Sequence, residues 1–346
     1  MPQRPRLTPA MADVRRAVRS GFEAAGVIAG ESVLVACSGG ADSLALAAAT
    51  QFEGQRAGIS VGAVVVEHGL QEATKAVAEE TRMRLEAMGL SPVRVMPVTV
   101  SRAGGSVDGG TEAAARSVRY QALETAAREL GSKAVLLGHT LNDQAETVLL
   151  GLARGSGMKS IAGMRTVTES GFGFVWLRPL LEITRLDTET FCQDSGLVFW
   201  VDPHNSVDDF ARVRVRNSVL PAAETALGPG VAEALARTAA LVQDDLDYLE
   251  AVADESYRSV VKLGPTGITA SAAGLEKLPA AIRGRVVHRI LSVFEGTPTK
   301  IHVDEVLQLI LNWHGQKELT LPGVRVVRHG DDLTFKSSKT LRPGAC

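Results

Sequence analysis

Runs of apolar residues alternate with helical patterns through the first 154 positions. Four runs are apolar nearly throughout, as in strands of a parallel sheet that is covered on both faces: residues 31–37, 61–70, 91–100 and 133–138. Helical patterns follow at 44–52, 74–88, 111–130 and 141–154. Such alternation is typical of βαβ units, so it predicts an α/β fold with a doubly wound parallel sheet.

The pattern changes after about residue 221. Apolar positions between 229 and 260 suit one long helix, and further helices are predicted at 279–294 and 302–313. Residues 317–335 alternate and contain two turn signals, which predicts a small antiparallel sheet. We therefore expect a larger α/β domain, a connecting helix and a smaller C-terminal α+β domain, at residues 1–222, 223–262 and 263–346.

Charge and cysteine content exclude several classes of protein. The 346 residues contain 37 Lys and Arg and 39 Asp and Glu, a net charge of -2, so bulk charge cannot hold nucleic acid. Residues 276–346 are basic, with 11 Lys and Arg against 7 Asp and Glu. Three widely spaced cysteines exclude a disulfide framework, and no apolar run approaches the roughly 18 residues of a membrane span. We expect a reduced, cytoplasmic protein without a membrane partner.

The strongest chemical signal is a hexapeptide between the first strand and its helix: Ser38, Gly39, Gly40, Ala41, Asp42 and Ser43. Two glycines allow close backbone approach, and the helix N-terminus points N–H groups at a phosphate. The segment lacks both the P-loop lysine and the GxGxxG pattern of a dinucleotide site. Asp42 would repel phosphates unless a cation such as Mg²⁺ intervenes. We interpret the hexapeptide as a nucleotide-binding loop; a capped strand–helix turn is the alternative.

Two acidic residues, Asp143 and Glu146, are spaced to share one face of the predicted helix 141–154. In a doubly wound sheet the carboxyl ends of the strands form the ligand crevice, where Ser38, His68 and His139 also fall. Carboxylates there can hold Mg²⁺, accept a proton or orient an attacking amine. The alternative is a pair of acids that stabilises the helix dipole.

Arginines form two groups. Arg116 and Arg119, on the helix 111–130, can clamp a base or a phosphate, or belong to a solvated helix face. A second group can contact RNA phosphates or cover a short helix: Arg212, Arg214 and Arg216. Cys37, which ends an apolar strand, is better interpreted as a small core residue than as a nucleophile.

The hexapeptide resembles the SGGxDS signature of the PP-loop ATP pyrophosphatases, which cleave ATP between the α and β phosphates. Further segments are similar to motifs of one member family, the tRNA(Ile)-lysidine synthases. They follow in order between about Ser32 and Pro221: residues 64–70, 112–123, 138–157, 178–181, 202–205, 212–216 and 220–221.

This resemblance implies ATP and Mg²⁺ as cofactors, and an isoleucine tRNA with a CAU anticodon and free L-lysine as partners. In that family ATP adenylates O2 of the wobble cytidine, and the lysine ε-amine then attacks C2 and displaces AMP. The modified tRNA reads AUA instead of AUG. The family also allows a homodimer, and residues 263–346 would bind the tRNA.

With the resemblance, each candidate residue receives a role. ATP is expected on the hexapeptide with His68 and His139, and Mg²⁺ on Asp42 and Asp143. The expected catalytic residues are Asp42, Asp143, Glu146 and Arg116. The expected tRNA contacts are Arg119, Arg212, Arg214 and Arg216.

Three positions depart from the family pattern, and three alternatives stay open. Asn142 replaces the first Asp of a DD pair, Glu67 stands for the Asp before His68, and Val213 replaces an Asn. One alternative is a PP-loop thiolase, which usually needs a cysteine pair or an Fe–S cluster. An amidotransferase would need a source of ammonia. A non-catalytic nucleotide- or tRNA-binding protein is the third, with Asn142 as its sign of lost activity.

Overall fold

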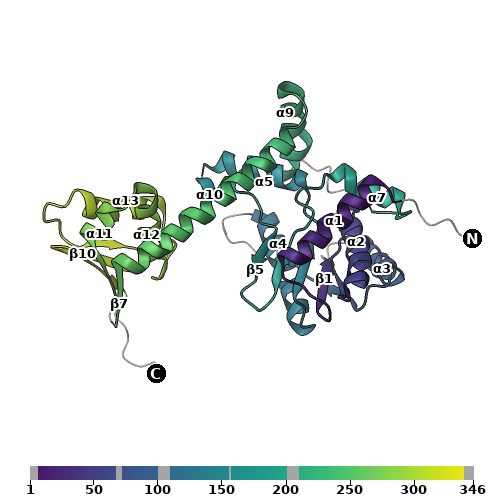
Figure 1. The fold of residues 1–346 in the computed structure, drawn as a ribbon, viewed down its shortest axis with the longest axis horizontal. Coiled ribbons are helices and arrows are strands. Elements are labelled where there is room, and N and C mark those ends of the chain that lie inside the picture. Colours follow the sequence, from purple (N-terminus) through teal and green to yellow (C-terminus); the bar gives the residue numbers. More distant parts are fainter. Residues whose placement is uncertain are drawn as a thin grey trace, which may run out of the picture. The chain divides into compact units, whose positions relative to one another are not determined.

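The chain divides into two compact units, Met1–Val242 and Gln243–Cys346 (Figure 1). The computed structural model describes residues 7–67, 72–99, 110–155, 157–200, 210–265 and 267–338. The division falls inside helix α10 (Val231–Val260), within the predicted connecting segment 223–262. The predicted boundaries of the three parts, at residues 1–222, 223–262 and 263–346, stay a prediction. Among the described residues, no helix has both the length and the apolar character that a membrane crossing requires.

Unit 1 is built on a six-stranded sheet of order β3-β2-β1-β4-β6-β5. Its strands are β1 (Ser32–Ala36), β2 (Ser60–Glu67), β3 (Val93–Pro97), β4 (Ala134–Leu137), β5 (Val167–Glu169) and β6 (Val175–Leu177). All neighbouring pairs are parallel except β5 and β6. The predicted doubly wound parallel sheet is therefore confirmed. The β5–β6 pair was not predicted, because three-residue strands are too short to show a period.

Helices cover both faces of this sheet. The helical segments of unit 1 are α1 (Pro9–Ala24), α2 (Ala41–Ala57), α3 (Glu72–Ala87), α4 (Gly110–Glu129), α5 (Leu141–Arg154), α6 (Met158–Ile161), α7 (Arg185–Asp194), α8 (Ala211–Arg214), a π-helix (Val215–Val219) and α9 (Leu220–Leu227). In β1, Val33 and Val35 pack into a core with α1, α2, α3 and α7, whereas Leu34 joins a second core with α4. The strand alternates between two buried faces, which explains its continuous apolar sequence.

The strand order sets the place of the ligand crevice. The chain passes from β1 to β2 and β3 on one side, then crosses to β4 on the other side of β1. Ligands bind where strand order reverses in such sheets, at the carboxyl ends of the strands. Here α2 begins after β1 and α5 begins after β4. The two ends touch, because a Cβ on Gly138 would lie 3.2 Å from the carbonyl oxygen of Asp42.

Unit 2 contains the predicted antiparallel sheet, of order β7-β8-β11-β10-β9. Its elements are β7 (Val261–Gly264), β8 (Gly267–Ser271), α11 (Ala272–Lys277), α12 (Ala280–Ser292), α13 (Lys300–Leu311), β9 (Leu319–Leu321), β10 (Val324–His329) and β11 (Asp332–Ser337). Val286, Val306 and Phe335, all fully buried, share one apolar core with α10. The smaller C-terminal α+β domain is confirmed, and the β7–β8 hairpin is an addition to the prediction.

Gly151 shows how packing overrides helix propensity. It lies inside α5, where alanine usually stabilises a helix by about 1 kcal/mol. A Cβ there would lie 2.0 Å from the carbonyl oxygen of Ser160, which belongs to α6. We expect Gly151→Ala to lower the free energy of unfolding by about 1–3 kcal/mol in calorimetry.

The matched control is Gly284 in α12, where a Cβ would meet nothing within 4 Å. Gly284→Ala should raise the stability of unit 2 by about 0.5–1 kcal/mol. Stabilisation by both substitutions would contradict the close approach of α5 and α6.

Candidate active site

The nucleotide loop, residues 38–43, is held in one shape by its own side chains. The Ser43 hydroxyl accepts from the N–H of Ser38 at 3.2 Å and donates to the Gly40 carbonyl at 2.9 Å. Gly39 has a φ of +84°, and a Cβ there would lie 2.6 Å from Thr81 Oγ1. The loop therefore needs glycine at this position. Its turn leads into the first turn of α2, where helical N–H groups have no partner within the helix.

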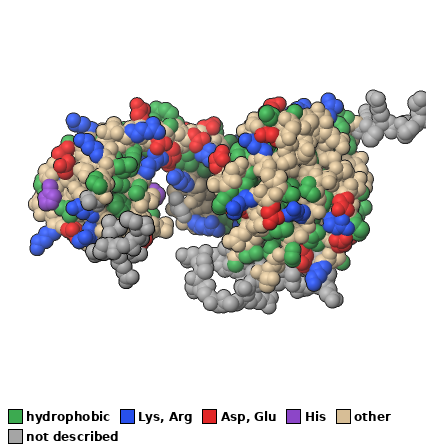
Figure 2. Space-filling view, turned by 90° about the horizontal axis from the view of Figure 1, so that it is seen from below, with side chains coloured by type: hydrophobic (Ala, Val, Ile, Leu, Met, Phe, Trp, Pro, Cys, Tyr) green, Lys and Arg blue, Asp and Glu red, His purple; other side chains and the backbone are tan. Residues whose placement is uncertain are grey.

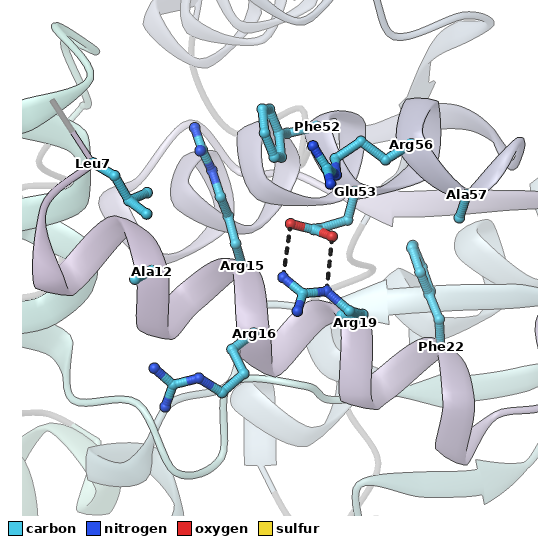
Figure 3. Close-up of a pocket in the computed structure, with 10 residues that line it drawn as sticks. All are labelled: Leu7, Ala12, Arg15, Arg16, Arg19, Phe22, Phe52, Glu53, Arg56 and Ala57. Carbon is cyan, nitrogen blue, oxygen red and sulfur yellow. Dashed lines mark hydrogen bonds and ion pairs between the residues drawn. The ribbon is translucent and has the colours of Figure 1, made fainter. Parts of the chain in front are cut away.

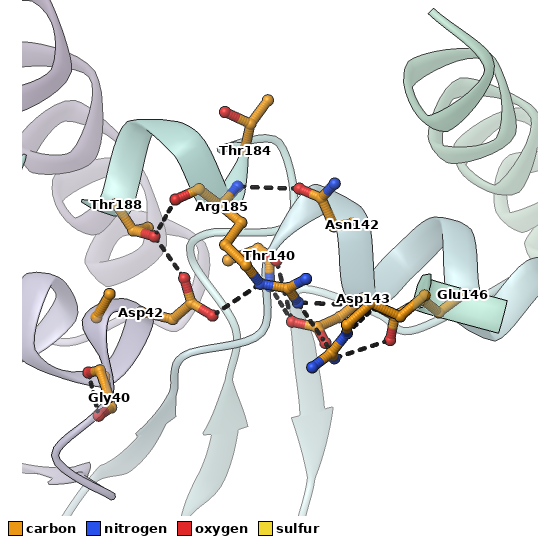
Figure 4. A network of polar contacts seen from close by, with 12 residues as sticks. Gly40, Asp42, Thr140, Asn142, Asp143, Glu146, Thr184, Arg185 and Thr188 are labelled. Atoms are coloured by element: carbon orange, nitrogen blue, oxygen red, sulfur yellow. Dashed lines mark hydrogen bonds and ion pairs between the residues drawn. The ribbon is translucent and has the colours of Figure 1, made fainter. Parts of the chain in front are cut away.

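Asp42 lies in the first turn of α2 and connects the nucleotide loop to α7. It accepts a hydrogen bond from the Thr188 hydroxyl, and Arg185 Nε lies 3.5 Å from its Oδ2 (Figure 4). Burial raises the pKa of Asp42, and the contacts with Thr188 and Arg185 partly offset this. The carboxylate side chain is 24% exposed, so it remains open to a ligand at the loop.

Asp143 and Glu146 lie on one face of α5, as predicted, and both are buried. Asp143 Oδ2 accepts from the backbone N–H of Thr140 at 2.8 Å and from its hydroxyl at 3.0 Å, which closes the N-terminus of α5. The side chain of Glu146 has no exposed surface. A buried carboxylate needs charged or hydrogen-bonding partners to remain ionised.

Three arginines supply those partners. Arg212 Nε lies 2.8 Å from Glu146 Oε2, and Arg216 Nε lies 2.7 Å from Glu146 Oε1. Terminal nitrogens of the three arginines lie 3.2–3.4 Å from Asp143 Oδ1. Arg185 reaches Asp42 with one nitrogen and Asp143 with another, so it bridges the two helix starts. We call this set the ion-pair network: Asp42, Asp143, Glu146, Arg185, Arg212 and Arg216.

The network affects the protonation of Asp143. Burial alone would raise the pKa of Asp143, but Arg212, Arg185 and the N–H of Thr140 outweigh it and hold the pKa at about 2. Asp143 therefore stays ionised at neutral pH, which makes it a charge-binding group and a poor proton acceptor.

His139, at the end of β4, is a neutral imidazole at physiological pH. Burial lowers the pKa of His139 to about 3. Nearby arginines also lower this pKa, whereas Asp143 acts in the opposite direction. Its Nδ1 is buried and has no hydrogen-bond partner among the described residues. Such an atom fits a ligand that supplies the missing partner. His68 was predicted beside it, but it lies outside the described residues.

The remaining predicted arginines are exposed. Arg116 donates to the Tyr120 hydroxyl at 3.1 Å and stacks over its ring, and Arg119 lies one turn along α4 from Arg116. Arg214 is exposed on α8, between the two arginines of the network. The structure thus brings Arg212 and Arg216 onto carboxylates, whereas Arg116, Arg119 and Arg214 remain at the surface.

A magnesium site on Asp42 and Asp143 is compatible with the donor chemistry. No group of three His, Cys, Asp or Glu gathers like metal ligands within the described ranges. The two carboxylates share the Arg185 guanidinium. Mg²⁺ commonly uses one or two carboxylates and takes its other oxygens from phosphates and water. Asp42 at the loop fits that arrangement best.

Family models match both units in chain order. Residues 13–223 match the PP-loop domain, and residues 271–334 match the TilS substrate binding domain. A tRNA(Ile)-lysidine synthase of Leifsonia xyli is 48% identical over 88% of this chain and 90% of its own length. Another of Thermobifida fusca is 47% identical over 95% of this chain and 98% of its own length.

The chain belongs to the tRNA(Ile)-lysidine synthase family. It is thus an ATP-using ligase of the PP-loop class, and the resemblance inferred from the motifs is confirmed. The fold also resembles that of a solved U34-tRNA thiolase, NcsA from Methanococcus maripaludis, with a TM-score of 0.57. That likeness covers 68% of this chain and 80% of the thiolase at 16% identity, so it shows the shared fold alone.

The departure at Asn142 from the lysidine synthase motif has a structural explanation. Asn142 Oδ1 accepts from the backbone N–H of Arg185 at 2.9 Å, at the first position of α7. This contact needs an acceptor oxygen, which an amide and a carboxylate both provide. Asn142 therefore positions Arg185, and its missing charge leaves the ion-pair network intact.

Sequence reasoning missed two residues of this site. Arg185 and Thr188 both contact Asp42 from α7. Both lie just beyond residues 178–181, one of the segments similar to lysidine synthases, and a Thr-x-x-Asp capping pattern at 184–187 marks the helix start. That pattern locates α7, but it does not indicate what α7 faces.

We expect Asp143 to make stability depend on pH. Its folded pKa of about 2 lies below the ordinary 3.8, so its stabilising effect is present above about pH 4 and is lost as pH falls toward 2. The unfolding free energies of wild type and Asp143→Asn should converge by about 2 kcal/mol between pH 6 and pH 2 in urea titrations.

The control is Asp244→Asn, which removes the same charge from an exposed position of α10. A gap for Asp143→Asn that is the same at pH 6 and pH 2 would contradict the low pKa.

Proposed function

We propose that this lysidine synthase joins free L-lysine to C2 of the wobble cytidine in an isoleucine tRNA with a CAU anticodon. The products are the lysidine-containing tRNA, AMP and pyrophosphate, and the codon read changes from AUG to AUA. The observation that carries the proposal is the nucleotide loop facing Asp143 and Glu146 at the reversal of strand order, in a chain of this family.

The ATP site would use the nucleotide loop and His139. The phosphates would accept from the N–H groups at the start of α2, where the helix dipole favours anions. Ser38 is exposed at the loop, whereas the Ser43 hydroxyl is committed to the backbone and serves to shape the loop. The unpartnered Nδ1 of His139 would bind another polar atom of the nucleotide. Asp42 would hold Mg²⁺, which supplies neutralising charge to the phosphates.

The reaction balances in two steps. Cytidine O2 attacks the α phosphorus of ATP, and pyrophosphate leaves with the electron pair of the broken P–O bond. The neutral ε-amine of lysine then attacks C2, AMP leaves with O2, and the nitrogen of the new C–N bond loses a proton to solvent or a nearby base. Asp143 stays ionised, so it would not be the group that accepts this proton.

The arginines would divide into two roles. Arg185, Arg212 and Arg216 are positioning residues, because their guanidinium groups orient Asp143 and Glu146. The exposed Arg116, Arg119 and Arg214 would contact the tRNA, through the cytosine or its phosphates. Unit 2 would bind another part of the same tRNA, in keeping with the family model that it matches. A homodimer stays a prediction.

The second candidate is a PP-loop enzyme that delivers another nucleophile, such as sulfur. The two described cysteines, Cys37 and Cys192, are both buried. Burial raises the pKa of the Cys37 thiol, and burial together with Asp42 raises the pKa of Cys192 to about 12. Thiols with raised pKa values are poor nucleophiles at neutral pH, so lysine transfer is favoured.

Incubation with ATP, Mg²⁺, radiolabelled lysine and the isoleucine tRNA tests the proposal. We expect label in this tRNA and none in a methionine tRNA with the same anticodon. Asp42→Ala should reduce the rate of incorporation by about 10²-fold or more, because the metal and phosphate charges lose their carboxylate. Asp244→Ala, an exposed acid on α10, should keep the wild-type rate.

The two other outcomes are equally informative. AMP released with tRNA but without lysine label would overturn lysine as the nucleophile and support the second candidate. Equal rates for Asp42→Ala and wild type would show that Asp42 has no part in the chemistry.

A further inference from the structure

A basic groove lies between α1 and α2 (Figure 3). We call it the α1/α2 groove, and its polar and aromatic lining is Arg15, Arg16, Arg19, Phe52, Glu53 and Arg56. Four arginines from the two helices line the groove together with one acid, Glu53, which is buried. The groove has no part in the active site described above.

Two of the arginines are neutralised within the protein. Arg19 binds Glu53 through two nitrogens, at 3.0 and 3.3 Å. Arg16 pairs with Asp13 at 2.7 Å. No carboxylate of the described residues forms an ion pair with Arg15 or Arg56, so these two cations are available to an external anion.

Arg15 and Arg56 are both arranged around the Phe52 ring. The Arg15 guanidinium carbon lies 3.7 Å from the ring centroid and that of Arg56 lies 5.7 Å from it. Figure 3 shows the ring between the two side chains. Phe52 is 37% exposed, and Arg15 Nε is buried without a hydrogen-bond partner. Both cations contact the ring, and the Nε of Arg15 is a donor for which the protein supplies no acceptor.

The groove lies far from the nucleotide loop. Helix α2 begins at Ala41, next to that loop, and Arg56 is fifteen residues further along it. At a rise of about 1.5 Å per residue, this places Arg56 about 22 Å from the start of α2. An anion in the groove is therefore separate from the ATP that the loop would hold.

The occupant that fits best is a chain of phosphates. The protein as a whole carries a net charge of -2, and Figure 2 shows Lys and Arg interspersed with Asp and Glu on the face drawn. A polyanion must then be attracted by local clusters. Figure 3 shows the Arg15 and Arg56 guanidinium groups at separate points beside the Phe52 ring instead of converging on one point, which suits successive phosphates better than one small anion.

We propose that the α1/α2 groove binds backbone phosphates of the tRNA substrate at a distance from the modified base. The identity of the RNA rests on the proposed function, whereas the phosphate chemistry rests on the groove alone. The groove would add affinity and leave the chemical step unchanged, because it touches neither the nucleotide loop nor the ion-pair network.

The test measures tRNA affinity against salt concentration for the full chain. We expect the double substitution Arg15→Ala with Arg56→Ala to weaken tRNA binding about tenfold or more. The slope of log affinity against log salt should fall by about 1–2, because about two phosphate contacts are lost. The turnover number at saturating tRNA and the affinity for ATP should match wild type.

Two further variants test whether misfolding or a general loss of positive charge could explain weaker tRNA binding. Arg56→Glu changes an exposed residue and should weaken tRNA binding while the melting temperature is retained. Arg128→Ala is the matched control, since Arg128 also lies over an exposed ring, Phe172 at 5.3 Å, but has Glu124 at 3.7 Å. It should leave the salt slope unchanged.

Wild-type affinity and salt slope in both groove variants would overturn the proposal. Binding of inorganic phosphate is measured for the same variants. If they lose phosphate binding but keep wild-type tRNA binding, the proposal is also overturned and the groove is assigned to a small anion. Binding is measured without catalysis, so a wild-type chain that forms no lysidine would refute the proposed function and leave the groove result valid.

Discussion

The gathering of three carboxylates at the meeting point of α2 and α5, two of them buried and Asp42 half-buried, is the constraint on which this site depends. Buried carboxylates are costly unless they are paired, and removal of one partner leaves an uncompensated charge. Here Asp42, Asp143 and Glu146 are balanced by three arginines from the segment that follows the sheet. The ion-pair network thus fixes the starts of α2 and α5 against α7 and α8, and it can do so only when all of these segments are folded.

This arrangement explains why the site can be both charged and stable. The guanidinium fork of Arg216 contacts both oxygens of Glu146, which fixes the direction of a side chain with no exposed surface. Asp42 stays partly exposed at the loop, whereas Glu146 is closed off. The same set of charges therefore provides Asp42 for ligands and Glu146 for structure. Asp143 lies between these two carboxylates and shares arginines with both.

The sequence predicted the sheet, the loop and the pair of acids because each depends on local pattern. A buried strand, a glycine turn and an i,i+3 spacing are visible within a few residues. Arg212 could not be separated from Arg214 in this way, although one binds Glu146 and the other is exposed. That difference comes from contacts between positions 66 residues apart in the chain. Helix α1 was also missed, since its amphipathic pattern precedes the first strand and belongs to no βαβ unit.

Helix α2 connects the two anion-binding features that the structure suggests. Its first turn carries Asp42, and its last turn carries Arg56, which leaves the apolar middle to pack under the sheet. The positive end of the helix dipole favours phosphate at the first site, whereas the second lies at the negative end. Anion binding there has to come from side chains alone, and α1 supplies the additional arginines. A helix whose middle is buried can thus serve a small, fixed nucleotide at one end and an extended polyanion at the other.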